Sequence, residues 1–169
     1  MAEILDLGGV RDRKAIDLAT AKNTRIPNAR RPERPPDALA AAMQFIQGSH
    51  PNIRLRSLTA TYNCVGMAFA SRRTCIEPHH VQMILDDDGY KEVAPADVVS
   101  GDLVIYRDKH GEISHVAVVV SHAPDIAKGQ WRTDVLSQWG SDGEYLHEIT
   151  DVSELLGKPD KFYSERRRL

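Results

Sequence analysis

The pattern of apolar and polar residues divides the chain into a helical first half and a β-rich second half. Leu39, Met43 and Ile46 recur at the spacing of one helix face and predict a helix over residues 38–46. From residue 90 onward, short apolar and alternating runs are typical of strands. The other elements that these patterns predict are helices over 11–21, 64–72, 78–85 and 151–157, and strands over 53–58, 90–93, 99–106, 113–121, 132–139 and 144–149.

This order of elements indicates an α+β fold, with N-terminal helices packed on one side of an antiparallel sheet. We expect residues 37–169 to form one domain. Residues 1–36 are expected to form a flexible basic arm, because prolines prevent a helix there and arginines resist burial. The arm could bind a partner protein, although a solvated lead-in is the simpler interpretation. The basic tail over 163–169 is likewise expected on the surface.

Charge and composition exclude several classes of protein. The net charge of −2 gives the chain no general attraction to nucleic acid or to an anionic membrane. No apolar run approaches the roughly 20 residues that span a bilayer. The N-terminus lacks a secretory signal, so we expect a chain that is cytoplasmic as synthesised or is delivered by a route that needs no signal.

Cys64 is the first candidate for chemistry. It follows the short polar turn Thr61-Tyr62-Asn63 and begins an apolar run that predicts a buried helix. The free N–H groups at a helix start favour a thiolate and can bind an oxyanion. Cys64 is therefore a candidate nucleophile, and a buried structural cysteine is the alternative. The sequence contains no Cys/His cluster with zinc spacing, and we expect neither a metal nor an organic cofactor.

His115 is the candidate base. It lies in a strongly apolar predicted strand, where it should point to the same face as Ile113, Ala117 and Val119. A helix carrying Cys64 on that face would bring the thiol and the imidazole together. The alternative is a core histidine that is hydrogen-bonded to a carbonyl group.

A third group should orient the imidazole by accepting a hydrogen bond from it. Ser137 and Gln138 lie on the next predicted strand and point to opposite faces, so only one of them can face the site. Gln138 carries the better acceptor. His147 on the following strand is the third candidate. Asp102 is more simply explained as a turn residue after Gly101.

Taken together, these motifs resemble papain-like cysteine peptidases and amidases of the compact NlpC and CHAP type. Tyr62-Asn63-Cys64-Val65-Gly66 is similar to their nucleophile motif. Gly101-Asp102-Leu103-Val104-Ile105-Tyr106 is similar to their glycine-aspartate strand start, and His115-Val116-Ala117-Val118-Val119 to their catalytic histidine strand. Ser137-Gln138-Trp139-Gly140 is similar to the asparagine-serine-tryptophan-glycine run of larger papain relatives. The resemblance covers about residues 55–150.

The resemblance implies hydrolysis or transfer of an amide bond. Cys64 would attack the carbonyl carbon, and His115 would hold the thiolate and then protonate the leaving amine. When Trp139-Gly140 is aligned with the tryptophan-glycine pair of these relatives, Ser137 occupies the usual place of the third catalytic residue. Gln138 and His147 stay alternatives. The residues expected to contact the oxyanion or the substrate are Tyr62, Asn63, Val65 and Trp139.

The implied substrate is a peptide, a peptidoglycan stem peptide or a protein. These families are usually exported, whereas the sequence shows no export signal. One alternative is therefore a toxin or effector domain that applies the same chemistry to a cytosolic target. The other is a catalytically silent papain-fold module that binds a partner.

Overall fold

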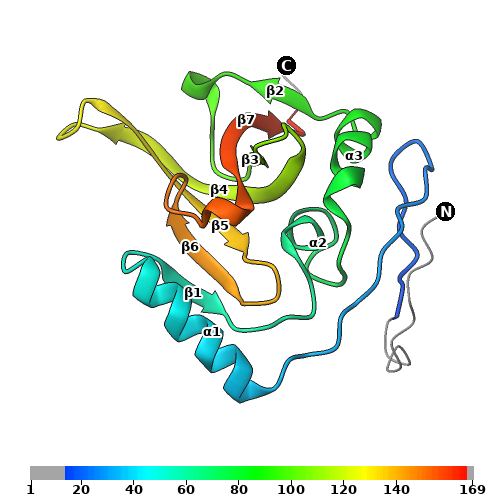
Figure 1. The fold of residues 1–169 in the computed structure, drawn as a ribbon. Helices are drawn as coiled ribbons and strands as arrows, with labels where there is room; N and C mark the ends of the chain where they lie inside the picture. The colour runs from blue at the N-terminus through cyan, green and yellow to red at the C-terminus, as the bar shows by residue number, and fades with distance from the viewer. Residues whose placement is uncertain (1–13, 167–169) are drawn as a thin grey trace.

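The computed structural model describes residues 14–166, which are built around one antiparallel sheet (Figure 1). The seven strands lie in the order β1-β6-β5-β4-β3-β7-β2. The α+β class predicted from the sequence is confirmed. The helices are α1 (Pro36–Ser49), α2 (Cys64–Phe69) and α3 (Val81–Asp87), and the strands are β1 (Arg54–Ser57), β2 (Lys91–Val93), β3 (Leu103–Arg107), β4 (Ile113–Asp125), β5 (Gln130–Gln138), β6 (Glu144–Glu148) and β7 (Lys158–Ser164). Among these residues, no helix is both long and apolar enough to cross a membrane.

The helices cover both faces of the sheet, so the expectation that they lie on one side is wrong. On one face, Leu103, Ile105 and Val116 form a core cluster with residues of α2 and α3. On the other face, α1 places Ile46 against two aromatic side chains, Trp139 and Tyr145. We call these the α2 face and the α1 face. A strand of a sheet that is buried on both faces needs apolar residues at successive positions. Strand β3 has them, because Leu103 to Tyr106 are all buried.

A β-bulge at the start of β4 decides which residues share a face. The pairing of β3 with β4 shifts between Tyr106 and Arg107. As a result, Ile113 packs on the α2 face, whereas Ala117 and Val119 belong to the cluster on the α1 face. The predicted common face for Ile113, Ala117 and Val119 is therefore wrong at Ile113.

Strand β7 is the element that the sequence patterns missed. It lies between β3 and β2, so it is an inner strand and not part of a surface tail. Its outward residues are charged and its exposure pattern is irregular. The sequence therefore lacks the alternation of apolar and polar residues that indicates a strand. Arg166, next to the end of β7, forms an ion pair with the buried Asp102 at 2.8 Å. Residues 167–169 of the predicted tail lie outside the described residues.

The N-terminal segment is extended, as expected, but it packs against the domain. The predicted helix over 11–21 is wrong where it is described, because Ala19 instead forms a β-bridge with Arg25 after a turn. Ile26 is buried in the core cluster that contains Cys64. Ala29 forms a bridge with Cys75. Residues 14–35 are therefore part of the packed structure, and residues 1–13 of the predicted flexible arm lie outside the described residues.

The start of α2 is held by the cap residue Asn63. Its side-chain oxygen accepts hydrogen bonds from the backbone N–H groups of Gly66 at 2.9 Å and Ile76 at 3.1 Å. Its amide nitrogen donates to the carbonyl oxygen of Ile76 at 2.7 Å. Gly66 lies so close to the backbone carbonyl of Thr74 that a Cβ atom would overlap it. The position of Cys64 therefore depends on this close approach of two backbone segments.

Replacing Gly66 with alanine should destabilise the fold. The added methyl group would displace the backbone at Thr74, and overpacking of this kind costs about 2–3 kcal/mol. Gly48→Ala is the matched control, because Gly48 also lies in a helix but has open space around its Cα atom. That change should be neutral or stabilise the protein by up to about 1 kcal/mol. Urea denaturation of both variants measures the difference, and equal midpoints would contradict the tight approach at Gly66.

Candidate active site

Cys64 is the first residue of α2 and only 5% of it is exposed. Burial raises the pKa of its thiol to about 11. The backbone N–H groups of Val116, Val65 and Cys64 itself interact with the sulfur and oppose this rise, as does the positive charge of Arg31. At neutral pH the thiol is therefore protonated, although several donors are ready to stabilise a negative charge there.

His115 in β4 is fully buried. Its ring packs edge-on against Tyr106, with 5.2 Å between ring centroids. Within the part of the chain that the structure describes, neither ring nitrogen has a hydrogen-bond partner. Burial lowers the pKa of His115 to about 3, with a further contribution from His147, so the imidazole is neutral.

Cys64 and His115 point to different faces of the sheet. Val116, which follows His115, packs in the same cluster as Cys64 on the α2 face. Because successive strand residues alternate, His115 points to the α1 face, like its cross-strand neighbour Tyr106. The expectation that the Cys64 helix would pack on the His115 face is therefore wrong. The two residues are neighbours through Val116, and their direct pairing stays a prediction.

The candidates for the third residue are divided in the same way. Ser137 and His147 lie on the α1 face with His115, and the Ser137 hydroxyl is 2.8 Å from Nε2 of His147. Nδ1 of His147 donates a hydrogen bond to the carbonyl oxygen of Glu148 at 2.8 Å. Nε2 of the neutral ring therefore accepts a hydrogen bond from Ser137. Burial lowers the pKa of His147, which favours this neutral form.

Gln138 lies on the α2 face and is fully buried. Its amide nitrogen donates to the carbonyl oxygen of Thr59 at 2.8 Å, while its own side-chain oxygen has no partner in the described part of the chain. Trp139 stacks edge-on with His147, at 5.5 Å between ring centroids, and with His50, at 5.1 Å. Trp139 and Gln138 therefore extend toward opposite faces from the end of β5.

The remaining predicted contact residues have clear structural partners. The Tyr62 hydroxyl donates to the carboxylate of Glu144 at 2.6 Å. Burial and this acidic partner raise the pKa of Tyr62 to about 12. Asn63 caps α2, and Val65 is fully buried in the core beside Cys64. No residue among 14–166 belongs to a group of three or more His, Cys, Asp or Glu that could hold a metal ion.

Glu144 is the residue of this region that the sequence patterns missed. Its buried carboxylate accepts hydrogen bonds from Arg72 at 2.8 and 2.9 Å and forms an ion pair with Arg56 at 3.2 Å. Burial alone would raise the pKa of Glu144, but the bonds from Arg72 and Tyr62 and the nearby positive charges keep it below its ordinary value. A glutamate that begins an alternating strand carries no sequence signal for such burial.

Comparisons of the chain with protein-family models, with curated proteins and with solved structures each found no significant match.

Removal of the Glu144 carboxylate should cost about 1–3 kcal/mol of stability, because the buried Tyr62 hydroxyl would lose its hydrogen-bond partner and the half-buried Arg72 its ion-pair partner. Glu144→Ala tests this in urea denaturation. Glu92→Ala is the control, since Glu92 pairs with Lys161 in an exposed ion pair and should cost less than about 1 kcal/mol. Similar losses in the two variants would contradict the central role of Glu144.

Acid should destabilise the protein before its carboxylates titrate. In the unfolded chain His115 binds a proton below pH about 6.5, whereas in the fold it stays neutral down to pH about 3. Its contribution is therefore present above pH about 6.5 and is lost at about 1.4 kcal/mol per pH unit as the pH falls toward 3. His147, whose pKa is also lowered, acts in the same direction.

His115→Phe should reduce the slope of the unfolding free energy against pH by the contribution of about one proton. Urea denaturation between pH 7 and 5 measures this slope. An unchanged slope in His115→Phe would show that His115 takes up its proton in the folded state.

Proposed function

We propose that this protein is a thiol-dependent amide hydrolase or acyl transferase of the papain-like kind, with Cys64 as the nucleophile. The observation that carries this proposal is the position of the sulfur. It lies at a helix start and interacts with backbone N–H groups from both α2 and β4, the strand that carries His115. Donors from two elements at one sulfur stabilise the thiolate, which is the nucleophilic form of the residue.

The chemistry proceeds in two displacements. The Cys64 sulfur bonds to the carbonyl carbon while the thiol proton passes to a base, and the C–N bond then breaks as that proton moves to the leaving amine. Water, or an acceptor amine in the transfer reaction, releases the thioester. The N–H groups of Cys64, Val65 and Val116 supply donors near the oxyanion.

His115 is the base in this proposal. It is neutral, and neither of its ring nitrogens has a hydrogen bond to break among the described residues before it accepts a proton. Because its ring points to the α1 face, the reaction requires the start of β4 to move so that the ring reaches the sulfur. Ser137 and His147, bonded to each other on the same face, are proposed to position the imidazole.

A second candidate function is a catalytically silent module that binds a peptide or protein. It is favoured by the placement of the Cys64 and His115 side chains on opposite faces and by the protonated, buried thiol. In that case Cys64 is a core residue and the surface beside it carries the function. The two candidates differ in whether a bond is broken.

Turnover of a fluorogenic peptide and stem-peptide library separates them. Cys64→Ala should reduce the rate at least about 1,000-fold, and His115→Ala about 100- to 10,000-fold. Cys75→Ala is the control, since Cys75 is also buried but its sulfur lies against the carbonyl oxygen of Thr61 and has no step in the proposed chemistry. Circular dichroism checks that each variant is folded.

Activity that survives in a folded Cys64→Ala or His115→Ala variant would contradict the mechanism. If the library is bound but never cleaved, the silent module is the better description.

A further inference from the structure

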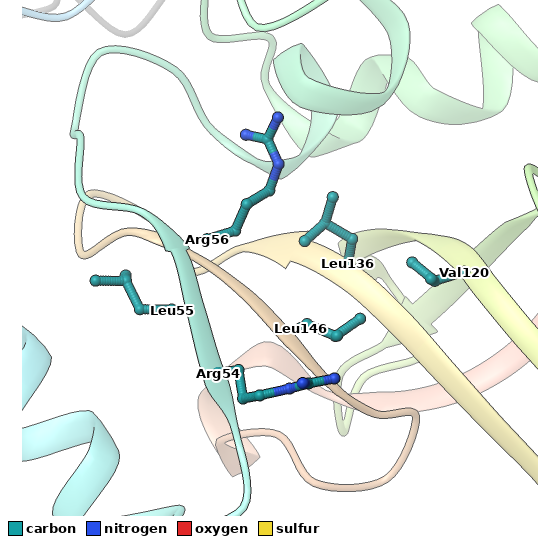
Figure 2. Close-up of a pocket in the computed structure, with 6 residues that line it drawn as sticks. All are labelled: Arg54, Leu55, Arg56, Val120, Leu136 and Leu146. Atoms are coloured by element: carbon teal, nitrogen blue, oxygen red, sulfur yellow. The ribbon is translucent and has the colours of Figure 1, made fainter.

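A groove of about 420 Å³ crosses the α2 face over strands β1, β4, β5 and β6 (Figure 2). Val120, Leu136 and Leu146 form its apolar floor, and Arg54 and Arg56 border it from β1. Val120 is 42% exposed, so this floor is open to solvent. Arg54 and Arg56 belong to the strand at one edge of the sheet.

The groove and the proposed nucleophile lie on the same face of the sheet. Strand pairing aligns Val118, Leu136, Leu146 and Arg54 in one row across β4, β5, β6 and β1. Val116, which packs with Cys64, is two residues before Val118 on β4. Two residues of a strand span about 7 Å. A substrate bound on this row would therefore lie on the face of the sheet from which Cys64 is approached.

The end of the groove at β1 is positively charged. Arg54 is exposed and forms no ion pair with any residue of the described part of the chain. Arg56 has Glu144 as its ion-pair partner, but that carboxylate already accepts two hydrogen bonds from Arg72. Two guanidinium groups thus share one carboxylate, and Arg54 adds a further positive charge at this end. On the same face, Glu148 is two residues after Leu146, the cross-strand partner of Arg54, and Asp134 beside it pairs with Arg132.

We propose that this groove binds an apolar side chain of a peptide substrate that also carries a carboxylate, with Arg54 and Arg56 binding the carboxylate. The proposal rests on the amide-cleaving function proposed above. The apolar floor buries an aliphatic side chain, and a guanidinium group binds a carboxylate through charge-assisted hydrogen bonds. The carboxylate can belong to an acidic side chain or to a peptide C-terminus, and the experiment distinguishes the two.

Binding is measured by fluorescence anisotropy with the Cys64→Ala protein, which cannot turn over the ligand. The probes are dansyl-Leu-Leu-Glu amide, dansyl-Leu-Leu-Gln amide and dansyl-Leu-Leu-Gln with a free C-terminus. At least one probe with a carboxylate should bind about tenfold more tightly than the neutral glutamine amide, and which one does so identifies the source of the carboxylate. Arg54→Gln should remove this preference, whereas Lys109→Gln, which removes an exposed charge in the β3–β4 turn, should keep it.

Equal binding of acidic and neutral probes, or an acid preference that survives Arg54→Gln, would overturn the proposal. Binding of lauric acid by a groove that binds none of the peptides would also overturn it. The proposed catalytic function is tested separately from the groove. If an acidic probe binds through Arg54 but the wild-type protein cleaves no peptide, the catalytic proposal fails and the groove stands. If peptides are cleaved through Cys64 without any effect of Arg54, the groove proposal alone fails.

Discussion

The buried carboxylate of Glu144 is the interaction on which the geometry around Cys64 depends. It begins β6, and it binds the hydroxyl of Tyr62 just before α2 and the guanidinium group of Arg72 just after it. Arg56 adds a contact from β1. One ionised group thus joins both ends of α2 to the sheet. A buried charge requires several partners to offset its desolvation, and here those partners come from separate segments.

These contacts hold the start of α2 in one position against the sheet. The cap by Asn63 and the close approach of Gly66 to Thr74 leave the helix little freedom to shift. Cys64 is therefore fixed among its backbone donors, protonated because it is buried. His115 is held neutral on the other face by the same lack of solvent. Within the proposed mechanism, the start of β4, where the bulge already breaks the regular pairing, is the element that moves.

The groove and the candidate site share one structural cause. Strands β4, β5 and β6 run past α2 and leave their outer residues uncovered, which exposes the row that contains Leu136 and Leu146. The arginines that stabilise Glu144 also place excess positive charge at the rim of this row. A structural ion cluster therefore gives the neighbouring surface its charge, and with it the chemistry of the proposed substrate.

The sequence by itself determined the α+β class, the helix over 38–46, the helix start at Cys64 and the strands that carry His115, Ser137 and His147. These features depend on local periodicity, turn residues and capping, which act over a few neighbouring residues. Tertiary structure alone decided the inner position of β7, the packing of residues 14–35 and the burial of Glu144. It also decided the face of each candidate residue. A single bulge before His115 changes which residues align, and the face on which a helix packs depends on contacts between distant segments, for which the local pattern has no signal.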